Sequence, residues 1–203
     1  MNTYKEVMSK EQIERAMAAL EANGIKAVYA ESEQVAKEKV LEMIPEGAEV
    51  MNMTSVTLDT LGLSEVINES GKYNSVRKSL GDKSVSAGEK RKSGGGPDWT
   101  VGSVHALTED GKLLIASNTG SQLGAYAYGA AHVIWVVGAQ KIVKNVDEGM
   151  KRVYDYVLPL ESMRANKAYN ITNGSAVRKL LIINSEGTPG RATAIVVNEA
   201  LGF

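Results

Sequence analysis

Residues 113–138 read LLIASNTGSQLGAYAYGAAHVIWVVG, and this stretch predicts an α/β fold. Its last part, Val133–Val137, is apolar at every position, so both faces of this strand should be buried, as in a parallel sheet with helices on each side. Leu113–Ala116 predicts an earlier strand, and the small residues of 124–131 predict a helix that packs closely on the sheet. A strand, a helix and a strand within about 25 residues form a βαβ unit with a right-handed crossover. Both strands should therefore lie at or near the centre of one sheet.

The loop between these two strands is the first candidate for a binding site. It places hydroxyl and amide side chains at the carboxyl end of a strand, where open α/β sheets bind ligands. The free backbone N–H groups and the dipole of the following helix would both favour an anion. One polar side chain should cap this helix, and a glycine should let the backbone approach a ligand; a loop that merely caps the helix would have the same composition. The predicted anion-binding residues are Ser117, Asn118, Thr119, Gly120, Ser121 and Gln122.

A second loop of the same kind follows an earlier strand. Ala48–Met53 predicts that strand, and Thr54 and Ser55 come directly after it, at the start of a helix. Two hydroxyl-bearing loops in one domain predict a shared pocket, although simple capping by Thr54 or Ser55 is again the alternative. The 117–122 loop has neither the dinucleotide-binding GxGxxG pattern nor the GxxxxGK[ST] pattern of a P-loop, so the anion is not assigned to a nucleotide.

The composition excludes several classes of function. The 203 residues are 43% hydrophobic and 23% charged, as is typical of a globular α/β protein. The net charge of −1 gives no reason to expect nucleic acid or an acidic membrane surface as a partner. Cysteine is absent, which excludes disulfides, thiolate nucleophiles and cysteine-ligated clusters. No apolar run is long enough for a membrane span, and the first 12 residues lack a signal-peptide core, so we expect a cytoplasmic protein.

The chain as a whole predicts a Rossmann-like three-layer α/β/α sandwich with a mostly parallel sheet. We interpret residues 1–203 as one domain, in which residues 1–46 form a small helical part that packs on the sheet. Residues 72–98 are basic and rich in glycine and serine, and they predict a loop or lid with one short helix at Ala87–Lys92.

The segment that surrounds the central loop adds three further predictions. Trp99–Leu107 predicts a strand, and the turn Thr108–Gly111 predicts a hairpin or tight crossover into the strand that begins near Leu113. An amphipathic helix should begin near Val146, and Pro159 should end it.

Glu109 is the carboxylate that we single out as a candidate nucleophile or general base. It precedes the strand that leads into the 117–122 loop, and partial burial would raise its pKa toward neutrality. An ordinary solvated turn residue is the alternative. His105 and His132 are 27 positions apart and lack a partner at metal-ligand spacing, so no metal site is predicted.

Three stretches resemble the lactate-utilisation (LUD) domain family. They are residues 101–164, from VGSVHALTEDG to VLPLESMR, the stretch MTSVTLDTLGL of 53–63, and the ending VVNEALGF of 196–203. The family is similar in fold to ribose-5-phosphate isomerase, glucosamine-6-phosphate deaminase and the CoA transferases. Some members are subunits of a lactate-oxidising complex with iron–sulfur partner proteins. Glu109-Asp110-Gly111 is similar to the Glu-Asn-Gly motif of the CoA transferases, whose glutamate is the nucleophile.

Three hypotheses of function follow from the residues and the resemblance. The first is a protein of lactate or related organic-acid utilisation that binds a small anionic ligand, such as an organic acid, a phosphate or a CoA ester, at helix N-termini. The second is a CoA-transferase-like or sugar-phosphate-isomerase-like enzyme that uses Glu109. The third is a non-catalytic scaffold that docks redox subunits. The sequence leaves open whether the protein is an enzyme, which cofactor it uses and whether it forms a homo-oligomer.

Overall fold

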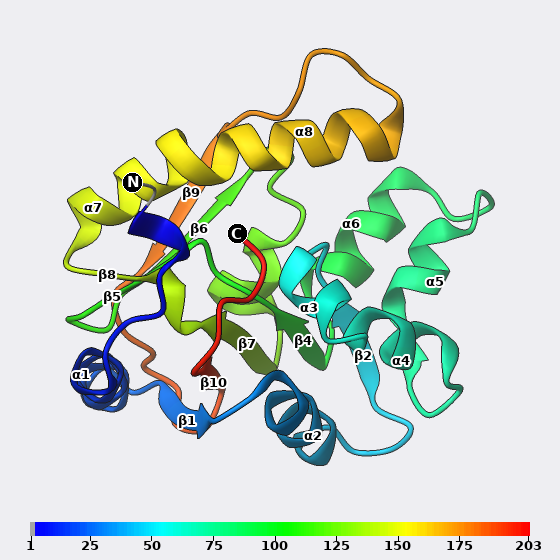
Figure 1. The fold of residues 1–203 in the computed structure, drawn as a ribbon. Coiled ribbons are helices and arrows are strands. Elements are labelled where there is room, and N and C mark those ends of the chain that lie inside the picture. The colour runs from blue at the N-terminus through cyan, green and yellow to red at the C-terminus, as the bar shows by residue number, and fades with distance from the viewer. Residues whose placement is uncertain (1–2) are drawn as a thin grey trace.

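The computed structural model describes residues 3–203, which form an α/β fold with two sheets (Figure 1). The larger sheet has six parallel strands in the order β1–β10–β7–β4–β2–β3. Its strands are β1 (Lys26–Ala30), β10 (Ala192–Val197), β7 (His132–Gly138), β4 (Trp99–Gly102), β2 (Glu49–Asn52) and β3 (Asn74–Ser75). The predicted α/β class and mostly parallel sheet are confirmed.

The smaller sheet has four strands in the order β8–β5–β6–β9. β6 is antiparallel to both of its neighbours, whereas β5 and β8 are parallel. The strands are β5 (Ala106–Thr108), β6 (Leu113–Ser117), β8 (Ile142–Val143) and β9 (Lys179–Ile183). The predicted hairpin through the turn Thr108–Gly111 is confirmed, and Gly111 has a φ of 80°, which a glycine adopts at no steric cost.

The strand β7 lies inside the larger sheet and is buried on both faces, as its sequence predicts. Trp135 is 0% exposed and belongs to a core that includes Ile115 of the smaller sheet. Ile134 and Val136 point to the opposite face and join a second core with Leu58 and the helices around it. Because successive side chains of a strand alternate between faces, an uninterrupted apolar run fills both cores.

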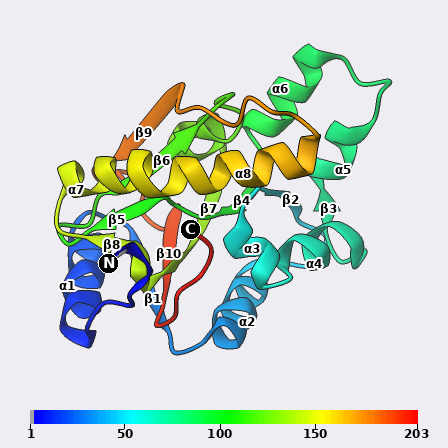
Figure 2. The ribbon, with the colours of Figure 1, turned by 45° about the horizontal axis from the view of Figure 1, so that its top comes forward.

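The helices cover the sheets in layers. They are α1 (Lys10–Ala22), α2 (Glu33–Met43), α3 (Val56–Thr60), α4 (Leu63–Glu69), α5 (Val76–Gly81), α6 (Ala87–Gly95), α7 (Val146–Lys151) and α8 (Leu158–Tyr169). Helices α2, α3 and α4 pack on one face of the larger sheet; α1 and the smaller sheet cover the other. Helix α7 packs on the outer face of the smaller sheet and runs on into α8 (Figure 2). The helices of the first 46 residues flank β1, which pairs with β10.

The prediction that the strands around the 117–122 loop form one βαβ unit was wrong. β6 belongs to the smaller sheet and β7 to the larger one, and only a π-helical turn, Ala125–Gly129, lies between them. The small residues of this segment serve two contacts: Ala125 and Ala130 join the core with β7, and a Cβ on Gly129 would lie 1.7 Å from the backbone oxygen of Gly95 in α6. Sequence proximity of two strands does not establish that they pair.

Two other segments differ from the sequence-based prediction. The region 72–98 is mostly helical, since α5 precedes the expected helix, and that helix extends to Gly95 as α6. Ser86 and Glu89 form a capping box at the start of α6, which compensates for its lack of an apolar stripe. The predicted strand Trp99–Leu107 divides into β4 and β5, which lie in different sheets.

Pro159 does not end the helix that begins at Val146. The chain continues through a π-helical segment, Arg152–Val157, into α8, and Pro159 lies in the first turn of α8. A proline is tolerated in the first turn of a helix because its missing N–H has no partner there. Pro159 therefore lies where the hydrogen-bond pattern changes from π-helical to α-helical, within a continuous helical segment that runs from α7 to α8.

Candidate functional site

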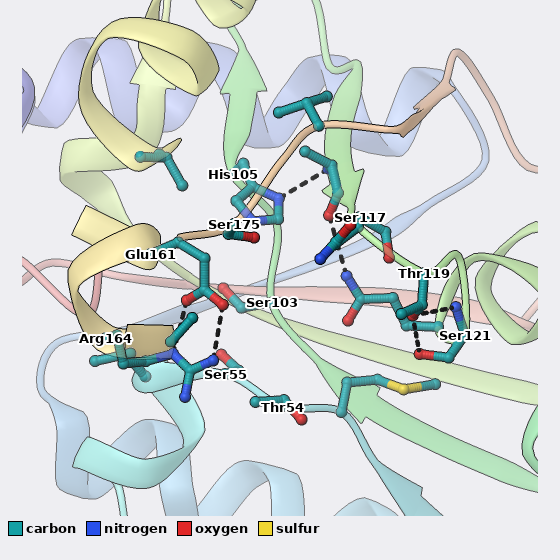
Figure 3. Close-up of a pocket in the computed structure, with 18 of the residues that line it drawn as sticks. Thr54, Ser55, Ser103, His105, Ser117, Thr119, Ser121, Glu161, Arg164 and Ser175 are labelled. Atoms are coloured by element: carbon teal, nitrogen blue, oxygen red, sulfur yellow. Dashed lines mark hydrogen bonds and ion pairs between the residues drawn. The ribbon is translucent and has the colours of Figure 1, made fainter. Parts of the chain in front are cut away.

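A pocket of about 390 Å³ lies where the carboxyl ends of β2, β4 and β6 meet beneath α8 (Figure 3). Its wall includes the loops that follow these strands, one side of α8 and the start of α5. Ligand pockets of proteins generally have volumes of about 300–1,000 Å³, so a small organic molecule fits this one. The meeting of strand ends from two sheets therefore creates the site.

The structure brings the two predicted loops together in this pocket. Thr54 and Ser55 follow β2, and Thr119 and Ser121 lie opposite them, beyond the end of β6 (Figure 3). The other predicted residues that line the pocket are Ser117, Asn118 and Gln122. Gly120 does not line it: with a φ of 84° it forms the turn of the loop, against the side chain of Lys179.

The 117–122 loop does not cap a helix, contrary to the prediction. Ser117 Oγ accepts a hydrogen bond from the Gly120 N–H at 2.9 Å, and the hydroxyls of Thr119 and Ser121 bond each other at 3.1 Å. The π-helical turn that follows has no side-chain cap. In the other loop Ser55 does cap α3, with its Oγ 3.5 Å from the backbone nitrogen of Leu58. The polar side chains of the 117–122 loop therefore stabilise the geometry of the loop itself.

Glu109 does not line the pocket, so the placement on which its predicted catalytic role depends was wrong. It lies at the start of the β5–β6 turn, whereas the pocket begins at Ser117, at the other end of β6. A strand rises about 3.3 Å per residue, so the five residues of β6 separate the two ends by roughly 16 Å. Glu109 instead accepts hydrogen bonds from Arg15 at 2.8 Å and Gln12 at 3.2 Å, which attach α1 to the hairpin.

Lys141 is the most distinctive group in the pocket wall. It is 2% exposed and lies at the end of a 3₁₀ turn directly after β7. Its Nζ donates to Thr57 Oγ1 at 2.9 Å and to Ser103 Oγ at 3.0 Å. None of the ion pairs formed within residues 3–203 includes Lys141. Burial lowers the pKa of Lys141 well below its ordinary value, and the nearby charge of Arg152 lowers it further.

His105 lines the pocket beside Lys141, and Arg152, which does not line it, contacts His105. The His105 Nδ1 accepts a hydrogen bond from the Ala116 N–H at 3.0 Å, so the proton of the neutral ring lies on Nε2. Burial, with the positive charges of Lys141 and Arg152, lowers the pKa of His105 to about 3. Arg152 is 0% exposed and donates to the His105 carbonyl oxygen, and its guanidinium lies 5.2 Å from the centre of the Tyr156 ring. At neutral pH the imidazole is therefore uncharged.

Two further arginines border the pocket. Arg77 donates two hydrogen bonds to the Asn52 carbonyl oxygen, at 2.8 and 2.9 Å, and a third to Thr54 Oγ1 at 3.2 Å. Burial lowers its pKa, and it too has no carboxylate partner among the described residues. Arg164 differs, because both of its nitrogens bond the Glu161 carboxylate at 2.7 Å (Figure 3). Glu161 and Arg164 therefore neutralise each other, and Arg77 remains as a cation of the pocket wall without a carboxylate partner among the described residues, joined by Lys141 whenever its amine is protonated.

Sequence reasoning missed these cationic residues. Lys141 stands between the apolar strand β7 and Ile142–Val143, and a lysine within such a run is the one signal that could have marked it. Arg77 lay in a segment interpreted as a loop, and His105 was considered only as a metal ligand. Within residues 3–203 no three His, Cys, Asp or Glu side chains are grouped as a metal site. No helix of that part of the chain is long and apolar enough to cross a membrane.

Comparisons with known proteins agree with this architecture. The family model described as the LUD domain matches residues 13–197. A search of curated proteins finds no match. A crystal structure of a DUF162 family protein from Deinococcus radiodurans is similar with a TM-score of 0.58 and 14% sequence identity, and the match covers 94% of this chain and 99% of that chain. At this identity the structural likeness shows the fold alone.

Proposed function

The chain belongs to the LUD domain family, and on that premise we propose that its pocket binds the anion of a small organic acid. Membership of the family implies a function related to lactate utilisation. The proposed ligands are lactate and related short hydroxy and oxo acids, which carry one carboxylate and one further oxygen. Their charge and size are the two properties that the pocket should recognise.

The observation that carries this proposal is the buried amine of Lys141, which has hydroxyl partners but no carboxylate partner among the described residues. Taking a charge out of water costs several kcal/mol unless an opposite charge compensates for it. A ligand carboxylate in the pocket would supply that compensation. A buried lysine without a carboxylate partner is thus most simply explained as half of an ion pair that forms when the ligand binds.

Arg77, which also lines the pocket, supports the same interpretation. Its guanidinium is fixed by the Asn52 carbonyl oxygen and by Thr54, so its orientation is settled before a ligand arrives. A guanidinium held in this way binds a carboxylate at little cost in side-chain entropy. The hydroxyls of Ser55, Thr119 and Ser121 would then bond the remaining ligand oxygen, since they line the same pocket.

The negative charge of Glu161 does not oppose this proposal. Its carboxylate is held by Arg164 through two hydrogen bonds, and these raise the pKa of Arg164. The pair contributes no net charge, so it leaves Arg77 and a protonated Lys141 free to attract an anion. No comparable observation favours an acyl-CoA or sugar-phosphate reaction at Glu109, which is bound to α1.

The proposal is tested by the thermal unfolding of the protein with lactate, pyruvate and inorganic phosphate. A ligand at 100 times its dissociation constant adds about 2.7 kcal/mol to the free energy of unfolding. Lys141→Met removes a charge-assisted hydrogen bond worth about 1.5–3 kcal/mol, so the affinity should fall roughly 10- to 100-fold. The matched control is Lys144→Met, because Lys144 is exposed and lies outside the pocket wall.

The carboxylates should stabilise the wild type and Lys144→Met equally, and Lys141→Met much less. Stabilisation by phosphate alone would assign the pocket to a phosphate ester instead of an organic acid. Equal stabilisation of all three proteins would show that the anion binds elsewhere. The absence of any stabilisation in the wild type would overturn the proposal.

A further inference from the structure

The hydrogen bonds around Lys141 have a fixed direction. The Ser103 hydroxyl donates its single hydrogen to the Val136 carbonyl oxygen at 2.6 Å. The Thr57 hydroxyl donates its hydrogen to the Leu201 carbonyl oxygen at 3.2 Å. A hydroxyl has one hydrogen, so each of these oxygens can only accept from Lys141. Both hydrogen bonds of the Lys141 Nζ are therefore N–H donations.

This arrangement determines what the amine presents to a ligand. Two N–H bonds and the bond to Cε occupy three of the four tetrahedral positions of Nζ, and Lys141 lines the pocket. The fourth position holds an N–H in the ammonium and a lone pair in the neutral amine. Because the two hydroxyls are satisfied by the same donations in both states, deprotonation of Lys141 breaks neither hydrogen bond.

The surroundings of Lys141 favour the neutral amine between ligand-binding events. Its neighbours are the neutral His105, the positive Arg152 and the two hydroxyls of Ser103 and Thr57. The Glu161 carboxylate in the pocket wall is bound by Arg164. Burial and the positive charge nearby both disfavour the ammonium, as in lysines that form Schiff bases.

We propose that Lys141 is an amine nucleophile that captures the keto group of a 2-oxo acid as an imine. The inference rests on the proposed function, because the acid must first bind in the same pocket, and Arg77 is the cation that would hold its carboxylate. An anion held there stays unreacted if it lacks a keto group, as lactate does. The pocket would therefore bind hydroxy acids reversibly and oxo acids covalently.

The reaction balances without an oxidant, a reductant or a metal. The lone pair of Nζ attacks the keto carbon, the C=O double bond becomes a C–O single bond, and a proton moves from nitrogen to oxygen to give a carbinolamine. Loss of the second nitrogen proton and of the hydroxyl group then forms C=N and releases one water. Hydrolysis of the imine reverses the step, so the capture is an equilibrium that hydride reduction would make permanent.

The experiment is reductive trapping of the full chain with pyruvate and cyanoborohydride near pH 7.4, followed by intact-mass measurement and peptide mapping. An ordinary lysine with a pKa near 10.4 is only about 0.1% neutral at this pH, so surface lysines react slowly. Lys141 should therefore carry the adduct at least about tenfold faster than the other lysines, with a mass gain of one pyruvate minus one oxygen. Excess lactate should slow the reaction, since it occupies the same pocket.

The control variants separate this inference from the proposed function. Lys144→Met should react like the wild type, and Lys141→Met should lose the fast adduct; if Lys141→Met fails to fold, peptide mapping of the wild type still locates the site. Stabilisation by lactate without an adduct on Lys141 would overturn the imine and leave anion binding intact. Adducts spread evenly over surface lysines would overturn it as well. Neither stabilisation nor an adduct would overturn both proposals.

Discussion

The β5–β6 turn and the pocket at the far end of β6 differ in how their charged side chains are paired. At the turn, the Glu109 carboxylate is matched by the Arg15 guanidinium at 2.8 Å and by the Gln12 amide. In the pocket, Lys141 is almost fully buried and bonds only neutral hydroxyls, and Arg152 behind it bonds a backbone carbonyl. The difference indicates separate roles. Paired charges attach α1 to the hairpin, whereas the unpaired cations of the pocket are available to a ligand.

The largest expected effect is a loss of stability in acid. Protonation of His105 would add a positive charge beside Lys141 and Arg152, and this should lower the free energy of unfolding strongly. The pKa of His105 is lowered from 6.5 to about 3, so its contribution to stability is complete above pH 6.5 and is lost as the pH falls toward 3. At 1.36 kcal/mol per pKa unit the fall from 6.5 to about 3 corresponds to about 5 kcal/mol at most. His105→Asn keeps an acceptor for the Ala116 N–H but cannot titrate, so it should lose less stability in this window.

The measurement is urea unfolding of the wild type and of His105→Asn at several pH values from 7 to 4. The difference between the two slopes isolates the histidine from the carboxylates, which titrate in both proteins. Parallel slopes would show that His105 accepts a proton without cost and that the pocket is less positive than its geometry indicates.

A smaller effect of opposite sign is expected from Lys141→Met in the absence of a ligand. The folded protein holds Lys141 at a lowered pKa, which costs free energy relative to the solvated, protonated lysine of the unfolded chain, so its removal should raise the free energy of unfolding by about 1 kcal/mol at pH 7. The Thr57 and Ser103 hydroxyls keep their carbonyl acceptors, so the substitution leaves them satisfied. Denaturant melts of Lys144→Met, which changes an exposed lysine, should show no gain.

The pH dependence of this gain follows from the lowered pKa of Lys141. Between its folded and unfolded pKa values the unfolded chain binds more protons, so the stability of the wild type rises with pH. The advantage of Lys141→Met should therefore shrink as the pH rises above 7. A clear loss of stability in Lys141→Met at pH 7 would mean that the lysine is a structural element of the core.

The smallest effect is expected at the turn. Glu109→Gln removes the ion pair with Arg15, whose side chain is 64% exposed, so the loss should be about 0.5 kcal/mol because solvent screens such pairs. Stabilisation by lactate or pyruvate should be unchanged, which thermal unfolding with each ligand would measure. Loss of that stabilisation in Glu109→Gln would instead connect the turn to the pocket and weaken the contrast between the two regions.

Much of the fold could be predicted from local patterns. The apolar run of β7 requires burial on both faces, and Ser32 before α2 and Ser55 before α3 are recognisable N-caps. The hydroxyl loops after β2 and β6 were found because polar residues at strand ends are visible in the sequence. The pairing of the strands could not be predicted, because the sequence of one strand does not show which other strand it pairs with or to which of the two sheets it belongs.

The charged part of the site could not be predicted for a related reason. Glu109 is close to Ser117 in sequence, but an extended strand places them at opposite ends of β6. Lys141 is 84 positions from Thr57 and 38 from Ser103, so only the folded chain shows that its amine meets these hydroxyls. A lysine is buried by the elements that pack around it, and the residues next to it in the sequence do not show whether this happens.

The most direct test of the central claim is a crystal structure of the protein grown with lactate, which binds without reacting. The account predicts a lactate carboxylate in the pocket, with an oxygen about 2.8 Å from the Lys141 Nζ or the Arg77 guanidinium. Figure 3 shows the space between Thr54, Thr119 and Arg164 that the ligand would enter. Lactate bound elsewhere on the protein, with this pocket holding only water, would contradict the account.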